Sequence, residues 1–161
     1  MKKPDFLSKL KEEGKLGLVE PSAEISKSYI NKADNCLKSA KLLLQNNLYE
    51  NSVSMSYYTM YNSLTALLFN CGLKCENHAG SIILFKELFG RMDLFKIISF
   101  AKKERIDKQY YVTSEKNFIL TKESAEDMLA KAEDFLVKMK LMISELRNEQ
   151  VETLRKKFET L

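Results

Sequence analysis

The sequence predicts an all-α protein: an up-and-down helical bundle of about four to five main helices, with a short N-terminal and an extended C-terminal helix. The 161 residues include only five glycines and two prolines, so few turns interrupt the chain. Apolar residues also recur at steps of three and four over most of residues 22–146, which is the period of a helix. We therefore expect one domain over residues 1–161, with a core of about 20–146 and a helical tail over 147–161.

The stretch 49–71 is predicted to be the central, mostly buried helix. Tyr58, Ala66 and Phe69 widen its apolar stripe until little exposed face remains. A strand is the competing prediction, but the stretch is too long for one, and Gly72 follows it as a helix stop. The stripe itself consists of Val53, Tyr57, Met60, Tyr61, Leu64, Leu67 and Leu68.

Two further helices are predicted before the central one. Residues 5–13 form a short amphipathic helix that packs on the body or on a partner, with Phe6, Leu7 and Leu10 on one side, and residues 14–21 form a linker. A long helix then begins at about Ser22, whose side chain can cap it. It ends at about Asn46 and pairs with the central helix as a helical hairpin. Its apolar face consists of Ile25, Tyr29, Ala33, Cys36, Leu37, Ala40, Leu43 and Leu44.

The remaining helices follow a turn at 72–77. Helices are predicted over 78–89 and 92–109, and an ordered loop over 110–120. Thr121 caps a helix that runs to about 146. The tail repeats an apolar strip out of phase with this helix, so it is predicted to offer a separate surface to a partner or a second subunit. The strip consists of Val151, Leu154, Phe158 and Leu161.

The composition is that of a soluble globular protein, with 45% apolar and 30% charged residues. No apolar run reaches the roughly 18 residues of a membrane span, and the first residues lack a signal-peptide core, so a cytoplasmic protein without membrane contact is expected. A net charge of +4 is compatible with nucleic acid but does not demonstrate binding. Three cysteines, an odd number, argue against a disulfide framework, and Cys36 is interpreted as a buried free thiol.

No motif of a common enzyme class is present: the sequence has no glycine-rich phosphate loop, nucleophile elbow, zinc-binding His-Glu-x-x-His or carboxylate cluster. Cys71, Cys75 and His78 have the spacing of a metal triad but lack a fourth ligand. Neither a metal nor a cofactor is therefore expected.

Several short segments, in order, resemble the prokaryotic HEPN family, whose members are small helical proteins often encoded beside a minimal nucleotidyltransferase. The likeness covers about residues 20–146 and includes 105–110 and the helix after Thr121. It is carried by the order and spacing of the segments Tyr57-Tyr58-Thr59-Met60-Tyr61, Ala66-Leu67-Leu68, Gly72-Leu73-Lys74, Asn77-His78-Ala79-Gly80 and Leu84-Phe85.

The resemblance implies a catalytic motif in which an arginine is followed, after four to six residues, by a histidine, and the pairs of two subunits meet across a dimer. Such a ribonuclease needs a base for the ribose 2′-hydroxyl and a cation for the charge that develops on phosphorus. Arg105 matches the cation, but Tyr110 stands in the place of the histidine. With a pKa near 10, tyrosine is ionised at roughly one part in a thousand at pH 7, so the motif is interpreted as degenerate. Five helical steps also place the two residues about 140° apart.

Other residues near this motif are candidates for contact with nucleotide or RNA. These are Lys102, Lys108 and Tyr111, together with Arg105 and His78. The alternative is a solvated helix end with structural ion pairs. The resemblance also implies that Tyr110 or Tyr111 could accept adenylate from the nucleotidyltransferase, or the two rings could cover an edge of the core. His78 matches a family His-x-Gly segment, where a structural role is favoured over catalysis.

The leading functional hypothesis is one half of a toxin–antitoxin-type pair that associates with nucleotide or RNA, forms a homodimer and has a nucleotidyltransferase as its partner. The alternative is a non-catalytic helical protein-interaction module, which the missing histidine favours.

Overall fold

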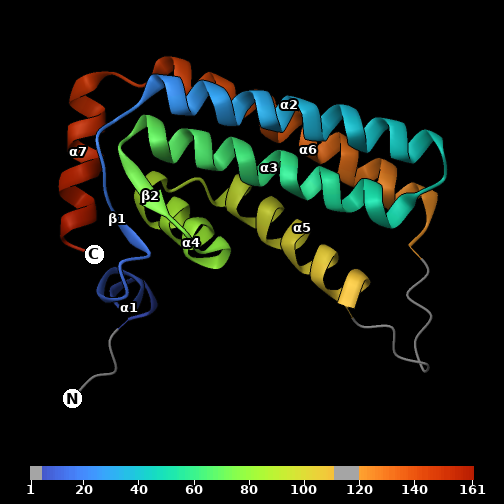
Figure 1. Cartoon of the computed structure of the whole chain (residues 1–161), viewed down its shortest axis with the longest axis horizontal. Coiled ribbons are helices and arrows are strands. Elements are labelled where there is room, and N and C mark those ends of the chain that lie inside the picture. The colour runs from blue at the N-terminus through green and yellow to red at the C-terminus, as the bar shows by residue number, and fades with distance from the viewer. Residues whose placement is uncertain (1–4, 111–119) are drawn as a thin grey trace.

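The computed structural model describes residues 5–110 and 120–161, and only the backbone at 106–110. These residues form seven helices and one two-stranded sheet. Three long helices run side by side: α2 (Ala23–Gln45), α3 (Tyr49–Asn70) and α6 (Lys122–Glu145), with α5 (Met92–Tyr110) packed obliquely against α3 (Figure 1). The all-α class is confirmed.

Local signals place the ends of the α2–α3 hairpin. Ser22 caps α2, because its Oγ accepts a hydrogen bond from the backbone nitrogen of Ile25 at 3.1 Å. The turn that follows α2 places Asn47 at φ 59°, a left-handed conformation that asparagine tolerates. Gly72, at φ 69°, follows α3. The predicted cap and both ends of the hairpin are thus confirmed to within a residue or two.

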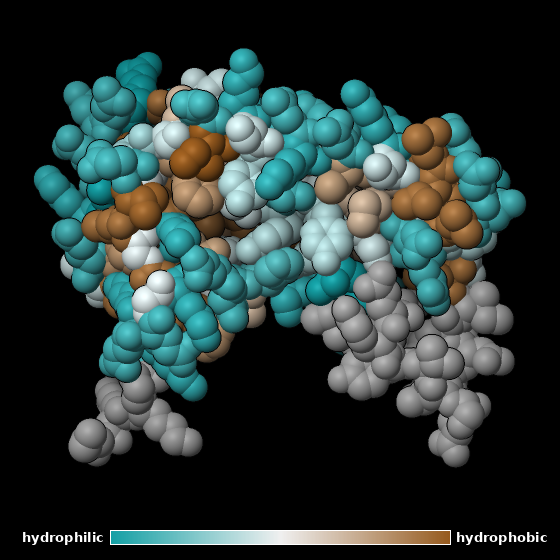
Figure 2. All heavy atoms as spheres, in the orientation of Figure 1, coloured by the Kyte–Doolittle hydropathy of each residue, from teal (hydrophilic) through white to brown (hydrophobic). Residues whose placement is uncertain are grey.

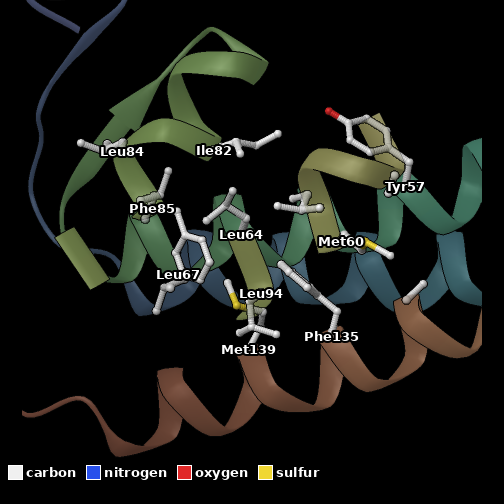
Figure 3. Packing of buried hydrophobic residues seen from close by; sticks show 14 of the residues in the cluster. Tyr57, Met60, Leu64, Leu67, Ile82, Leu84, Phe85, Leu94, Phe135 and Met139 are labelled. Atoms are coloured by element: carbon white, nitrogen blue, oxygen red, sulfur yellow. The ribbon is translucent and has the colours of Figure 1, made fainter. Parts of the chain in front are cut away.

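Helix α3 lies at the centre of the core, as predicted. It packs against α2, α5 and α6, and Tyr57, Met60 and Leu64 are wholly buried. Phe135 and Met139 of α6 point toward it in Figure 3. Thr121 caps α6, since its Oγ1 accepts a hydrogen bond from the Ser124 backbone nitrogen at 3.1 Å.

Two predicted irregular segments instead form a small antiparallel sheet. Strand β1 (Leu16–Leu18) was expected to be linker, and β2 (Leu73–Cys75) was expected to be part of a turn. Leu16 pairs with Cys75, and Leu18 pairs with Leu73. Three residues are too few to display a periodic pattern, and the partner strand lies far away in the sequence, so local patterns could not predict this pairing.

The chain that leaves β2 leads directly into α4 (His78–Phe89). Asn77 caps this helix, because its Oδ1 accepts a hydrogen bond from the Gly80 backbone nitrogen at 2.8 Å. The backbone nitrogen of Glu76, just after β2, donates a hydrogen bond of 2.8 Å to the backbone oxygen of Lys15, just before β1. The chain is therefore fixed on both sides of His78, the first residue of α4: before it by the hydrogen bond of Glu76, and after it by the helix cap that Asn77 provides.

The prediction that the C-terminal tail presents its apolar strip to another molecule is wrong. Helix α7 (Asn148–Glu159) packs on its own chain, and the Phe158 side chain is only 4% exposed. Leu146 adopts an extended conformation, with ψ at 122°, which ends α6 and redirects the chain across the end of the bundle (Figure 1). The change of axis explains how a strip out of phase with α6 can still face the core of the same molecule.

Residues at the N-terminal side are divided between core and surface. In α1 (Phe6–Glu12), Leu7 and Leu10 are buried as predicted, but Phe6 is 41% exposed. Ile25 was assigned to the apolar face of α2 and is also 41% exposed, while Ser26 beside it is buried. A strip assigned from spacing alone extends too far at helix ends, where no neighbouring helix covers it.

Much of the surface drawn in Figure 2 is hydrophilic, and hydrophobic residues gather toward the two ends of the molecule. Among the described residues, no helix combines the length and the apolar character that crossing a bilayer requires.

Candidate functional site

Five side chains from three helices form one cluster, which we call the aromatic–arginine cluster. Helix α3 contributes Tyr57, Tyr58 and Tyr61, α4 contributes His78, and α5 contributes Arg105. The tyrosines follow one another at steps of one and three, so they share the side of α3 that α4 and α5 cover.

His78 is held by a hydrogen bond and by ring stacking. Its Nδ1 lies 2.8 Å from the hydroxyl oxygen of Tyr57, and its ring stacks on that of Tyr61 with centroids 3.8 Å apart. Burial lowers the pKa of His78 below its ordinary value of 6.5, and the positive charges of Arg105 and Lys102 lower it further. The imidazole is therefore neutral at pH 7.

The Tyr57 hydroxyl indicates which nitrogen of the histidine carries the proton. The residue is wholly buried, and burial raises the pKa of its phenol well above the usual range. A buried hydroxyl needs an acceptor for its proton, and Nδ1 of His78 lies within reach. With Tyr57 donating to Nδ1, the neutral ring carries its proton on Nε2 and presents a donor there.

Tyrosine side chains also hold the guanidinium of Arg105. Its Nη1 donates a hydrogen bond of 3.0 Å to the hydroxyl oxygen of Tyr58. The central carbon lies 5.2 Å from the ring centroid of Tyr57 and 5.3 Å from that of Tyr58, within the range of cation–π attraction. The Nε atom is buried without a hydrogen-bond partner. Within the described part of the chain no carboxylate forms an ion pair with Arg105. The side chains that orient its guanidinium group are therefore those of the tyrosines.

The other predicted candidates are only partly brought together with this cluster. Lys102 is half-buried on α5 and close enough to lower the pKa of His78. Tyr111 and the side chains of Lys108 and Tyr110 lie outside the described residues. Helix α5 continues through Tyr110. Since the helix does not end between them, Arg105 and Tyr110 stay about 140° apart around its axis within one chain.

The role of the three tyrosines was not predicted from the sequence, which treated them as part of an apolar stripe. A signal was nevertheless present, because a core helix that uses tyrosine in place of phenylalanine must find partners for its hydroxyls. In α3 those partners are His78 for Tyr57 and Arg105 for Tyr58.

The cysteines are not members of this cluster, although Cys75 lies close enough to Tyr61 to raise the pKa of that phenol. Burial raises the pKa of the Cys71 thiol to about 12. The Cys75 thiol donates to the backbone oxygen of Asn77 at 3.3 Å. Cys36 is half-buried, which differs from the buried position predicted, and its sulfur accepts a hydrogen bond from Asn62. The described residues contain no grouping of three or more histidine, cysteine or acidic side chains suited to a metal ion.

The fold and the cluster place this chain in the class of small helical proteins, and its central helix holds an arginine and a neutral histidine in one cluster. Comparison with known proteins identifies the family. The sequence model described as "HEPN domain" matches residues 26–142. This chain belongs to the HEPN domain family.

Three relatives have similar length and clear sequence identity. "Putative toxin MJ0605" of Methanocaldococcus jannaschii is 32% identical over 124 residues, which is 71% of this chain and 85% of that protein. "Putative toxin MJ0142" of the same organism is 31% identical over 69% of this chain and 76% of its own length. A "UPF0332 protein" of Thermotoga maritima is 30% identical over 72% of this chain and 89% of its own length.

Proposed function

We propose that this chain is the toxin-like member of a two-gene pair, that it binds RNA at the aromatic–arginine cluster, and that its protein partner is a nucleotidyltransferase. The observation that carries the RNA proposal is the placement of Arg105, whose guanidinium is held by the Tyr58 hydroxyl and two tyrosine rings. The names of two relatives, which contain the word toxin, support the biological role.

The geometry suits a phosphate ligand. A guanidinium offers five donors in a planar fork, and its contact with Tyr58 uses a hydrogen of Nη1. Because Tyr57 and Tyr58 already hold the group in place, less side-chain freedom is lost when an anion binds. Lys102 adds a second positive charge, and the protonated Nε2 of His78 adds a neutral donor. Together these groups favour a phosphodiester.

We further propose that the nuclease motif is degenerate and that the chain binds RNA without cleaving it. Tyr110 occupies the position of the motif histidine, and a phenol is a poor base at neutral pH. His78 does not replace that base, since its Nδ1 is occupied by Tyr57 and its Nε2 carries the proton. The only described imidazole therefore acts as a donor.

Homodimerisation through the face around Arg105 is part of the proposal. The family motif works across two subunits, and α5 separates Arg105 from Tyr110 within one chain. The proposed interface does not include the C-terminal tail, because its Phe158 side chain is buried in its own subunit. Sedimentation is expected to show a dimer at micromolar protein, and a monomer at high concentration would overturn this part of the proposal.

RNA binding can be tested by fluorescence anisotropy with a short single-stranded RNA. Arg105→Ala is expected to weaken binding at least tenfold, the effect of losing about 1.4 kcal/mol of charge-assisted contact. Arg91→Ala is the matched control, because this substitution removes the same charge at a site where the arginine is paired with Asp93. Equal affinity of wild type and Arg105→Ala would overturn the proposed site.

Catalysis and partnership need separate tests. The wild type is expected to leave a labelled RNA intact, while Tyr110→His is expected to produce metal-independent cleavage by restoring the base. Wild-type cleavage that survives both Arg105→Ala and Tyr110→Phe would show that another site is responsible.

For the toxin–antitoxin pair, expression of this chain alone is expected to arrest growth, and co-expression of a neighbouring nucleotidyltransferase is expected to relieve the arrest. Growth that is unaffected, together with no RNA binding, would favour the interaction module.

A further inference from the structure

A pocket of about 590 Å³ lies beside Arg105, between the C-terminal half of α2 and the N-terminal half of α3. Leu42 and Leu43 of α2 and Met55 of α3 form its apolar walls. Tyr58 and Arg105 line the pocket as well, so it adjoins the aromatic–arginine cluster. Figure 2 shows hydrophobic residues gathered toward the end of the molecule where α2 turns into α3.

The pocket contains polar groups that the protein itself leaves without partners. The Nε of Arg105 is buried and makes no hydrogen bond. The half-buried Ser39 and the exposed Asn51 also line the pocket, and neither side chain makes a hydrogen bond within the described part of the chain. Buried polar groups are ordinarily satisfied, and each exception needs an explanation. The Nε of Arg105 is such an exception, and a ligand with an acceptor at that point would satisfy it. Ser39 and Asn51 can bind polar groups of the same ligand in place of water.

The combination of groups narrows the chemistry of that ligand. The volume falls within the range of about 300–1,000 Å³ that is usual for small-molecule sites. Apolar walls with an aromatic ring and a guanidinium plane suit a flat heteroaromatic ring, which stacks on such groups. The amide of Asn51 can donate and accept at once, as recognition of a base edge requires. An aliphatic ligand would displace water from Ser39 and Asn51 without replacing its hydrogen bonds.

We propose that this pocket binds the base of a nucleotide whose phosphate lies against Arg105. The inference rests on the proposed RNA function and extends it: Arg105 contacts the backbone, and Asn51 with Ser39 reads the base. The nucleotide is a residue of the bound RNA or a free nucleoside monophosphate, since both offer the same base and phosphate.

The test measures RNA binding by anisotropy and AMP binding by calorimetry for the same set of proteins. Asn51→Leu replaces the amide by a branched apolar group with the same number of non-hydrogen atoms and is expected to weaken binding about fivefold, as the loss of one or two hydrogen bonds predicts. Leu42→Trp places a large ring at the exposed wall, where Leu42 is 61% exposed, and is expected to obstruct the pocket without unfolding the protein. Asn35→Leu is the matched control, because Asn35 is an exposed asparagine of α2 that does not line the pocket.

The outcomes separate this inference from the proposed function. Weaker binding by Asn51→Leu and Leu42→Trp, with Asn35→Leu unchanged, supports the pocket. RNA binding that depends on Arg105 but not on Asn51 or Leu42 overturns the pocket and leaves the proposed function standing. Binding of AMP that depends on Asn51, without RNA binding, supports the pocket with a free nucleotide as its ligand and overturns the RNA function. Binding of neither ligand by the wild type overturns both.

Discussion

The hydroxyl oxygen of Tyr57 lies 2.8 Å from Nδ1 of His78, which joins the buried centre of α3 to the first residue of α4. Figure 3 shows Tyr57 at one edge of the core cluster, with its hydroxyl directed toward the helix that carries Ile82. One hydrogen bond thus sets both the orientation of the only histidine and the nitrogen that carries its proton.

Tyr57→Phe is expected to lower the free energy of unfolding by about 1–3 kcal/mol, because it leaves Nδ1 of a half-buried histidine without a partner. Denaturant titration measures this loss. The same substitution at Tyr49, whose hydroxyl donates to Asn47 at the surface, is the control and is expected to change stability by less than about 0.5 kcal/mol. Equal effects of the two substitutions would mean that the bond to His78 contributes nothing to the fold.

The titration of His78 is expected to have its midpoint below pH 6.5, because burial and the charges of Arg105 and Lys102 disfavour the imidazolium. The protein has one histidine, so its NMR resonances can be assigned without ambiguity. Arg105→Ala is expected to raise the midpoint toward the ordinary value, since it removes one of the repelling charges. A midpoint above 6.5 in the wild type would contradict the proposed environment.

The same shift predicts a pH dependence of stability. Between the lowered native pKa and the unfolded value near 6.5, the unfolded chain binds more protons than the native protein, so stability rises with pH across this interval. The contribution of neutral His78 to stability is complete above the unfolded pKa and is lost as the pH falls toward the native pKa. Denaturation from about pH 8 to about pH 5 is expected to show a steeper loss for wild type than for His78→Gln, which retains the carboxylates but lacks the imidazole.

Gly72→Ala is expected to destabilise the protein more than Gly14→Ala. Both glycines have a left-handed φ, near +70°, where a Cβ costs about 1–2 kcal/mol. A Cβ at Gly14 would meet nothing within 4 Å, so this variant measures the backbone cost alone. At Gly72 it would also collide with the Arg155 side chain and lie 2.5 Å from the backbone oxygen of Val19. Thermal denaturation measures the two losses of stability. Equal losses would show that the groups around Gly72 leave room for a Cβ.

Arg155→Ala is expected to lower the free energy of unfolding by about 2 kcal/mol or more, because the Nη1 of Arg155 donates to three backbone oxygens. The acceptors are those of Val19 at 2.7 Å, Gly72 at 2.8 Å and Cys71 at 3.3 Å. Lys156→Ala, an exposed charge of the same helix, is the control and is expected to be nearly neutral. If the tail instead served only a second subunit, Arg155→Ala would shift the sedimentation of the protein and leave the stability of the monomer unchanged.

The sequence by itself determined the helices and their order. Ser22 and Thr121 as caps, Gly72 as a stop and the almost entirely apolar character of the central helix are local properties, because capping and periodicity involve residues within a few positions of one another. The HEPN resemblance was likewise carried by local segments of α3 and α4. Arg105 was selected from that resemblance, but the sequence contained no information on what would surround it.

Only the tertiary structure decided which side chains meet. Tyr58 lies 47 positions before Arg105, and Tyr57 lies 21 before His78, so their contacts depend on how α3, α4 and α5 pack. The pairing of β1 with β2 and the folding back of α7 depend in the same way on surfaces formed by distant segments. The physical reason is that helical periodicity identifies the face that is buried, whereas the partner of a buried hydroxyl or guanidinium is set by the relative positions of whole helices.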